Sequence, residues 1–194
     1  MKRGNIQEVN TMTDERDGRT YRTVKIGSQV WMAENLSFTI DNAIGCCYEN
    51  DEKYKEYGRL YDWVEAMSIA PEGWHLPTKE EWQTLFDLVE IDSSSNKIDG
   101  STAGKYLKAK AGWNDYLGQS GNGTDEFGFS ALPGGGGFSD GSFLDVGYYG
   151  NWWSASEGNS DYAYCHFMDY NDAVKWYSSN KSSLYSVRCV KDKS

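Results

Sequence analysis

The chain has 194 residues, of which 15% are aromatic, so it is long enough to bury a substantial core within one domain. Its formal net charge of −10 disfavours contact with nucleic-acid phosphates, and we expect no nucleic-acid partner. No stretch approaches the roughly 20 apolar residues of a membrane span, and the basic start lacks the apolar core of a signal peptide. We therefore expect neither membrane insertion nor a signal peptide.

The N-terminal part predicts a short extension followed by a β-hairpin. We place the extension at residues 1–13 and a single domain at residues 14–194. The acidic segment that opens the domain lacks the alternating ligands of a calcium loop, so we expect a solvated turn there. Residues 19–36 then alternate around the Gly27-Ser28 pair, which is typical of a hairpin.

A first amphipathic helix is predicted within residues 57–70. Its apolar residues recur at spacings of three and four, as on one helical face. They are Leu60, Trp63, Val64 and Met67. Pro71 marks the end of this helix.

A second helix begins near Thr78, where the local signal is clearest. Thr78 is an N-cap residue with Glu81 three positions later, which is the spacing of a capping box. Trp82, Leu85, Phe86 and Val89 then form one apolar face. His75 precedes the cap, and we expect it to form structural hydrogen bonds near the helix start rather than to bind zinc. A third short helical piece is predicted within residues 101–113.

A long irregular region separates the helices from the closing strands, roughly between residues 112 and 152. The glycine run 134–137 lacks the Lys-Ser/Thr ending and helix start of a phosphate-binding loop, so we expect a structural loop. Asp125, Glu126 and Asp140 have no spacing that is diagnostic of a calcium site and are expected to be surface charges. We therefore predict no metal and no cofactor.

The four cysteines predict no catalytic centre. Cys46 and Cys47 are neighbours and are not expected to bond to each other. Cys165 and Cys189 lie on two predicted strands of one sheet, where they either pair or remain free thiols. Cys165 is followed by His166, but adjacent strand residues point to opposite faces, so the pair is badly placed for mutual activation.

Residues 151–186 have an unusual composition. Asn, Tyr, Ser and Asp supply four, five, eight and three residues there, which is 20 of 36. Acidic residues outnumber basic ones by 24 to 14 over residues 1–150, whereas residues 151–194 carry five of each. Tyr, Ser and Asn give the contact chemistry of antibody paratopes, although Tyr and Ser also suit exposed strands and turns.

Six blocks occur in a fixed order along the chain. They are DGRTYRTVKIGSQVWMAENL, YGRLYDWVEA, PEGWHLPTKEEWQTL, DEFGFSALPGGGG, WWSAS and YSVRCVKD. Together, from about Asp14 to Asp192, they resemble the Fibrobacter succinogenes major paralogous domain. The resemblance implies an α+β, C-type-lectin-like fold of the formylglycine-generating-enzyme branch. Two helices would then pack on short antiparallel sheets beside a long irregular loop region. Ala70 replaces the Cys that many members have before the Pro of the third block, so their disulfide pattern is not expected here.

The resemblance also suggests a function. Some proteins of this fold, in phages and gut bacteria, are targets of diversity-generating retroelements, which mutate adenines so that AAC-type codons become Asn, Tyr, Ser or Asp. It therefore favours a non-enzymatic protein that binds an unknown protein or glycan through a variable segment, residues 151–186. We expect such a protein at a bacterial cell surface, secreted or on a phage particle. The alternatives are an adhesion or glycan-binding module and a formylglycine-generating oxidase; the Glu-Pro-Asn and Gln-Pro-Asp motifs of calcium-dependent lectins are absent from the sequence.

The strand near residue 165 has two alternating faces. Tyr164 and Met168 resemble fixed positions of the family, so we predict that their face, with His166, points inward at the start of the strand. The residues expected to face a ligand lie on the other face, in the turn and on the following strand. They are Tyr162, Cys165, Phe167, Asp169, Tyr170, Asn171, Asp172, Trp176, Tyr177, Ser178 and Asn180.

Overall fold

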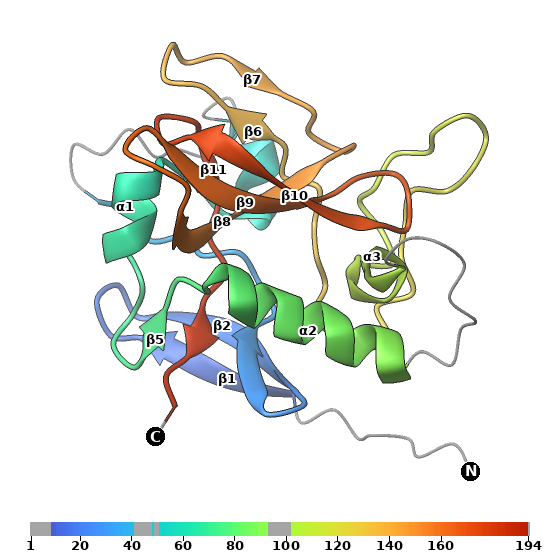
Figure 1. The fold of residues 1–194 in the computed structure, drawn as a ribbon, viewed down its shortest axis with the longest axis horizontal. Helices are drawn as coiled ribbons and strands as arrows, with labels where there is room; N and C mark the ends of the chain where they lie inside the picture. The colour runs from blue at the N-terminus through green and yellow to red at the C-terminus, as the bar shows by residue number, and fades with distance from the viewer. Residues whose placement is uncertain (1–8, 41–47, 49–50, 93–101, 194) are drawn as a thin grey trace.

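The computed structural model describes residues 9–40, 48, 51–92 and 102–193 and is a mixed fold with mostly sheet and few helices (Figure 1). The long helix α2 (Lys79–Asp92) lies between two five-stranded sheets. Short helix α1 (Trp63–Ser68) and the turn of helix α3 (Ala103–Leu107) flank it on either side. A 3-10 helix spans Glu52–Tyr57. None of the described helices is long and apolar enough to cross a bilayer.

The first sheet joins the two ends of the described chain. Its strands, in spatial order, are β1 (Val9–Asp14), β2 (Arg19–Ile26), β3 (Gln29–Met32), β12 (Val190–Lys191) and β5 (Trp74–His75). The β2–β3 hairpin turns at Gly27 as predicted, and Val190 of β12 pairs with Trp31 of β3. The last strand therefore joins the sheet of the N-terminal hairpin. Strand β1 includes residues 9–13, which we had assigned to the N-terminal extension. The sequence there is mostly polar and gave no strand signal, and the strand forms through main-chain pairing with β2.

The second sheet carries the segment of unusual composition. Its strands, in spatial order, are β10 (Val174–Asn180), β9 (Tyr162–Met168), β8 (Gly150–Glu157), β11 (Tyr185–Ser186) and β4 (Leu60–Tyr61). All neighbours are antiparallel except β8 and β11, which meet at a single parallel pair. A small hairpin of β6 (Gly136–Gly137) and β7 (Phe143–Leu144) lies above this sheet (Figure 1).

The start of α2 has the predicted capping box. The Thr78 Oγ1 accepts a hydrogen bond from the Glu81 amide at 3.2 Å, and the Glu81 carboxylate accepts one from the Thr78 amide at 3.0 Å. The four residues of the predicted apolar face are buried, namely Trp82, Leu85, Phe86 and Val89. Helix α3 lies where the third helical piece was expected.

His75 fastens the beginning of α2 to the end of the chain, as its predicted structural role requires. Its Nδ1 lies 2.6 Å from Asp192 Oδ1 and its Nε2 lies 3.0 Å from the Glu81 carboxylate. Burial of the ring opposes protonation, but the hydrogen bonds with Asp192 and Glu81 together outweigh burial and raise the pKa of His75. The imidazole therefore links two carboxylates, which favour its protonated form.

The predicted face of α1 is wrong. The helix begins only at Trp63, after Asp62 caps it by accepting a hydrogen bond from the Glu65 amide at 2.8 Å. Leu60 belongs to β4, while Val64 and Met67 are 68% and 46% exposed. The apolar residues that suggested one helical face belong partly to strand β4 and partly to helix α1, so they do not share a face.

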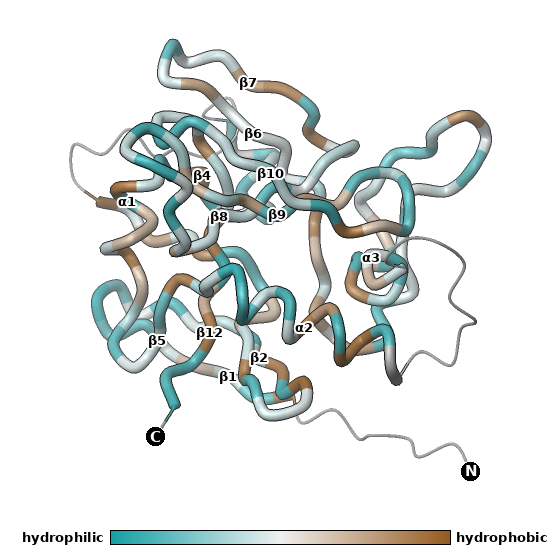
Figure 2. Tube along the Cα trace, viewed as in Figure 1, coloured by the Kyte–Doolittle hydropathy of each residue, from teal (hydrophilic) through white to brown (hydrophobic). Residues whose placement is uncertain are grey.

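Two hydrophobic clusters form the main core. The first cluster packs α2 and α3 against β2, β3, β8 and β12. The second cluster packs α1 against β3, β8, β9 and β11, together with Cys189, which directly precedes β12. Each cluster takes residues from both five-stranded sheets. Figure 2 shows hydrophobic stretches along α2 and β12, with hydrophilic residues concentrated in the connections.

A fully buried cation, Arg188, lies between the sheets. Its Nε and Nη2 donate to Asn35 Oδ1 at 3.1 and 2.8 Å, and its guanidinium also donates to the carbonyls of Phe129 and Ser130. The Trp152 indole donates to the same Asn35 oxygen at 2.9 Å. Burial lowers the pKa of Arg188 to about 9, so the guanidinium remains charged at neutral pH. One amide oxygen therefore supports a buried charge and a buried indole.

The amide nitrogen of Asn35 completes this junction. It donates to the Tyr57 carbonyl at 2.8 Å and to Ser186 Oγ at 3.3 Å. Asn35 thus connects the residues after β3 with the 3-10 helix, β8 and β11.

We predict that Asn35→Ala lowers the free energy of unfolding by about 3–5 kcal/mol, because it removes the acceptor of two hydrogen bonds of the buried Arg188 charge and the acceptor of the Trp152 indole. Urea denaturation measures the loss. The matched control is Asn10→Ala on the exposed strand β1, which should change stability by less than about 0.5 kcal/mol. Equal effects of the two substitutions would contradict the role of Asn35.

His166 lies on β9 and is buried against the apolar face of α2. Its ring centroid lies 5.3 Å from that of Trp82 and 5.4 Å from that of Phe86, and its Nδ1 has no hydrogen-bond partner among the described residues. Burial lowers the pKa of His166 to about 3, and the positive charge of Lys79 acts in the same direction. The imidazole is therefore neutral in the folded protein.

We predict that His166→Leu makes the protein less sensitive to acid. Below pH 6.5 the His166 side chain binds a proton in the unfolded chain but not in the folded protein, where its pKa is about 3. The free energy of unfolding of the wild type therefore falls as the pH falls from 6.5 toward 3. The wild type should lose up to about 1.4 kcal/mol per pH unit more than the variant between about pH 6 and 4. Urea denaturation across this pH range measures the difference in unfolding free energy between the two proteins. The titration of His75 affects both proteins equally and cancels from this difference. Parallel pH profiles would contradict a buried, neutral His166.

Candidate functional site

The predicted binding residues divide between two faces of the second sheet. In the register of β9 and β10, Trp176 pairs with His166 and Tyr177 pairs with Cys165. Cross-strand partners share a face, so Trp176 lies on the side of α2 and Tyr177 on the opposite side. The single patch that we expected to contain both rings is therefore wrong, and two separate surfaces take its place.

Two of the predicted residues are buried. Cys165 has no exposed surface and Asp169 is only 3% exposed, so the prediction that they face outward is wrong. Strand β9 is covered on both sides: His166 and Met168 pack toward α2, and Cys165 packs in the cluster of Trp153. Alternation therefore separates two buried faces here, and not an inner face from an outer one.

The remaining predicted residues reach the surface to different extents. The exposed ones are Tyr162, Asn171, Asp172, Trp176, Ser178 and Asn180. The half-buried ones are Phe167, Tyr170 and Tyr177. The structure thus brings most of them to β10, to the β9–β10 turn, or to the space beneath the β6–β7 hairpin.

The β9–β10 turn is held from below by Lys108. This lysine is fully buried, and its Nζ donates to the carbonyls of Asp169 at 3.0 Å and Asn171 at 2.8 Å. Burial lowers the pKa of Lys108. Asp169 adds two further contacts: its carboxylate accepts from the Asn171 amide at 2.8 Å and from Lys175 Nζ at 3.1 Å. The turn therefore displays side chains on a fixed main chain.

On the α2 side, Trp176 is 51% exposed and is part of a small aromatic and cationic cluster. The Lys79 ammonium lies 3.7 Å from the centroid of Trp176 and 4.4 Å from that of Tyr164. The two rings meet edge to face at 5.4 Å. The face of Trp176 is consequently already occupied by a cation from the first turn of α2.

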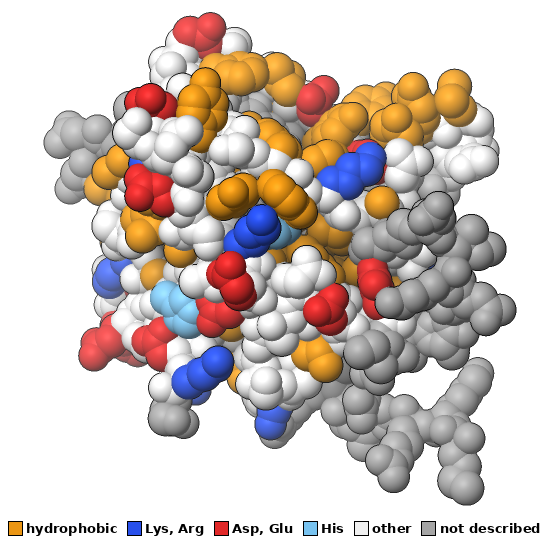
Figure 3. Space-filling view, viewed as in Figure 1, with side chains coloured by type: hydrophobic (Ala, Val, Ile, Leu, Met, Phe, Trp, Pro, Cys, Tyr) orange, Lys and Arg blue, Asp and Glu red, His pale blue; other side chains and the backbone are white. Residues whose placement is uncertain are grey.

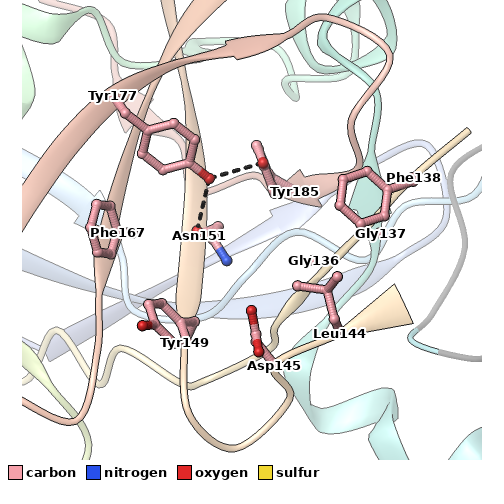
Figure 4. Close-up of a pocket in the computed structure, with 10 residues that line it drawn as sticks. All are labelled: Gly136, Gly137, Phe138, Leu144, Asp145, Tyr149, Asn151, Phe167, Tyr177 and Tyr185. Atoms are coloured by element: carbon pink, nitrogen blue, oxygen red, sulfur yellow. Dashed lines mark hydrogen bonds between the residues drawn. The ribbon is translucent and has the colours of Figure 1, made fainter. Parts of the chain in front are cut away.

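A pocket of about 440 Å³ lies on the other face, between the sheet and the β6–β7 hairpin. Figure 4 shows its walls: aromatic rings from β9 and β10 on one side, and the glycines of β6 with the ends of the hairpin on the other. The lining residues are Gly136, Gly137, Phe138, Leu144, Asp145, Tyr149, Asn151, Phe167, Tyr177 and Tyr185. Phe167 and Tyr177 were predicted as binding residues; the others were not.

Hydrogen bonds within the pocket wall hold its aromatic rings in place. The Tyr177 hydroxyl lies 2.9 Å from that of Tyr185 and 3.3 Å from Asn151 Oδ1 (Figure 4). The Tyr185 hydroxyl also lies 3.0 Å from Ser179 Oγ. Burial, together with Cys165 and Tyr185, raises the pKa of Tyr177 well above its usual range, so its phenol stays neutral.

The glycine run 134–137 is structural, as predicted, and its Gly136 and Gly137 line the pocket opposite the rings. A Cβ at Gly136 would lie 2.9 Å from the Tyr185 ring, and one at Gly137 would lie 3.0 Å from the Phe143 ring. Gly135 adopts φ 66°, and a Cβ there would lie 2.5 Å from the Leu144 carbonyl oxygen. Glycine is required because this segment lies so close to Tyr185 of the sheet and to the partner strand β7.

Exposed hydrophobic residues continue around the pocket mouth and beyond it. Phe138 and Leu144 are exposed beside Tyr148, and Leu117 is 88% exposed on a loop whose Tyr116 stacks on Tyr170 at 3.9 Å. Figure 3 shows hydrophobic side chains gathered along the upper edge of the molecule, where β6, β7 and this loop lie in Figure 1. The only sequence signal for this region was the unusual length of the irregular stretch, since its apolar residues follow no period.

The carboxylates once considered for calcium cap local turns. Asp125 accepts from the amide and the hydroxyl of Ser130, both at 2.7 Å, and Asp140 accepts from Ser142. Within the part of the chain that the structure describes, no three His, Cys, Asp or Glu side chains gather as a metal site.

A family model described as the Fibrobacter succinogenes major domain matches residues 24–191. The chain belongs to this family. No curated protein and no solved structure matches the chain. The matched range of the Fibrobacter succinogenes major domain runs from β2 to β12, so it includes α2, the glycine run and the whole pocket.

Two thiols of this Fibrobacter succinogenes major domain are buried and do not line the pocket. Cys165 and Cys189 are free and fully buried, and they lie near different sheets, so the predicted pairing alternative is not realised. Burial raises the pKa of the Cys165 thiol to about 12 and that of the Cys189 thiol to about 12. Both are therefore unreactive thiols at neutral pH. Cys46 and Cys47 lie outside the described residues.

We predict that Cys165 and Cys189 react with a thiol reagent only after unfolding. The measurement uses the double variant Cys46→Ser and Cys47→Ser, so that only these two thiols remain. At about pH 8 the folded variant should label at least 100-fold more slowly than in denaturant, because both thiolates are buried and disfavoured. Labelling of one thiol per chain within seconds under native conditions would contradict this arrangement.

Proposed function

We propose that the protein is a non-enzymatic ligand-binding protein that displays residues 151–186 as a sequence-variable surface on a C-type-lectin-like scaffold, as in the variable proteins of diversity-generating retroelements. The observation that carries the proposal is the position of this segment. Its accessible side chains lie on the edge strand β10, in the turns on either side of β9, and along the pocket wall, while its main chain belongs to a five-stranded sheet.

The residue types that a diversity-generating retroelement would introduce are mostly accessible to solvent in this segment. Of the 20 Asn, Tyr, Ser and Asp residues in the segment, 13 are exposed or half-buried. They are Ser156, Asn159, Ser160, Asp161, Tyr162, Tyr164, Tyr170, Asn171, Asp172, Tyr177, Ser178, Asn180 and Ser182. These positions can change without leaving a cavity in the core.

The other seven are buried and make structural hydrogen bonds or ring contacts. They are Asn151, Ser154, Asp169, Ser179, Ser183, Tyr185 and Ser186. Asn151, for example, donates to the Gly135 carbonyl at 3.1 Å, and Ser186 Oγ accepts from Asn35. For these seven, a structural role explains the residue type, which narrows the proposed variable set to the accessible 13.

Two features support the scaffold and the absence of catalysis. The pairing of β3 with β12 brings both ends of the domain into one sheet, and α2 packs beneath the strands of the segment, as a C-type-lectin-like fold would require. A formylglycine-generating oxidase depends on reactive cysteines, whereas Cys165 and Cys189 are buried with a raised pKa. Binding is thus better supported than oxidation.

We predict that a library randomised at Tyr162, Asn171, Asp172, Ser178 and Asn180 remains mostly folded and yields binders to an arbitrary protein target. These side chains are exposed, so each substitution should change stability by about 0.5 kcal/mol or less. Surface display with a conformation-sensitive label measures folding, and selection against an immobilised protein measures binding. The control library varies Asn151, Ser154, Asp169, Ser183 and Ser186, which are buried, and should be mostly unfolded.

Two results would count against the proposal. The first is a folded surface library from which no target selects a binder. The second is genomic: a diversified gene has a near-copy of its 3′ segment beside a reverse-transcriptase gene, differing mainly at adenines. A complete surrounding genome without such a copy would remove diversification from the proposal and leave an adhesion or glycan-binding module.

A further inference from the structure

We propose that the pocket beneath the β6–β7 hairpin binds a cationic group of the ligand, namely an ammonium, a guanidinium or a quaternary ammonium. The inference rests on the proposed function, since four lining residues belong to the proposed binding segment, namely Asn151, Phe167, Tyr177 and Tyr185. It adds the chemical class of the group that enters the pocket and a second wall that lies outside the segment.

The first argument is the arrangement of aromatic rings. Phe167 meets Tyr177 edge to face with 5.4 Å between centroids, and it meets Tyr149 at 6.0 Å. Tyr177 in turn meets Tyr185 at 6.4 Å. Figure 4 shows these rings around one open space. A small cation inside a pocket of about 440 Å³ would lie within the roughly 6 Å of several ring centroids over which a cation–π contact acts.

The second argument is charge. Asp145 lies at the lower edge of the open space in Figure 4, and no described residue gives its carboxylate a hydrogen bond or an ion pair. None of the ten lining residues is basic. The pocket therefore joins several electron-rich ring faces with one uncompensated negative charge, which complements a cation and repels an anion.

A cation of the protein itself already uses one of these rings. Lys175 Nζ lies 5.6 Å from the centroid of Phe167 while it bonds to Asp169 at 3.1 Å. Lys175 is not among the lining residues, so it occupies the neighbourhood of the pocket and not its interior. A ligand cation would enter from the other side, where Asp145 is.

The polar groups of the pocket favour a cation over a sugar. Asn151 donates to the Gly135 carbonyl and accepts from Tyr177, and the Tyr177 and Tyr185 hydroxyls bond to each other. These groups are satisfied within the protein, so few donors remain for the many hydroxyls of a sugar ring. A cation needs only the ring faces and the Asp145 carboxylate.

The test compares two probes of nearly equal shape, choline and 3,3-dimethylbutan-1-ol, which replaces the charged nitrogen of choline with carbon. Both are titrated into the wild-type protein while chemical shifts of the aromatic and Asp145 resonances are followed by NMR. We expect choline to shift the pocket resonances with a Kd at least about 10-fold lower than that of the neutral alcohol, in the range that cation–π and carboxylate contacts together supply.

Three variants separate the contributions. Asp145→Asn should weaken choline binding by about 5-fold or more and leave the neutral alcohol unchanged, since only the charge is removed. Tyr149→Leu should weaken choline more than the alcohol because it keeps an apolar wall and removes a ring face. The matched control Asp17→Asn, in the exposed β1–β2 turn of the other sheet, should have no effect on either probe. Thermal unfolding of each variant verifies that it is folded.

Equal affinities for the two probes would overturn the proposal and leave an apolar pocket. Saturating choline that shifts no pocket resonance would overturn it as well. These results are independent of the library selection, because a folded library can yield binders whose ligands carry no cation. Conversely, choline can bind a protein whose segment never diversifies, so each failure identifies which proposal is wrong.

Discussion

The structure depends on a charge that is taken out of water. Arg188 is fully buried between the two sheets, and no carboxylate among the described residues forms a salt bridge with it. Its hydrogen bonds go to the Asn35 amide oxygen and to two main-chain carbonyls within the irregular region, while its Cζ lies 4.4 Å from the centroid of the Phe129 ring. A buried cation with neutral acceptors tolerates little displacement, because each lost bond leaves charge unsolvated. The position of this one side chain therefore fixes how β3, β8, β12 and the loop near residue 129 meet.

This rigidity separates the residues that support the proposed binding surface from the residues that form it. Trp152 shares the oxygen of Asn35, and Lys108 holds the β9–β10 turn through two main-chain carbonyls. Both contacts act from behind the sheet and neither uses a side chain that faces the pocket mouth. The side chains on β10 can thus differ in size and polarity while the strand keeps its place, which is the arrangement a binding site of changing specificity needs.

Local features were predictable from the sequence and features assembled from distant segments were not. The cap and buried face of α2 follow from residues within one turn of each other, so Thr78 and Trp82 behave as expected. The exposure of Cys165 was mispredicted because alternation says which residues share a face but not what covers it, and β9 is covered on both sides. The pocket joins Gly136, Asp145 and Tyr177 from three separate segments. No pattern along the chain records that meeting, and the glycine run 134–137 predicted only a structural loop.

The place of β10 at the border of its sheet has a further consequence. No described strand pairs with its outer main-chain groups, and such an edge favours pairing with another copy of the same chain. Under the proposed function, a new sequence on β10 must therefore keep the protein soluble as well as recognise a target. Lys175 and the exposed Asn180 place a charge and a poor strand former near the two ends of β10. Lys175 and Asn180 would oppose edge-to-edge aggregation of β10. Selection for solubility would then remove aggregating variants before binding to any partner could be selected.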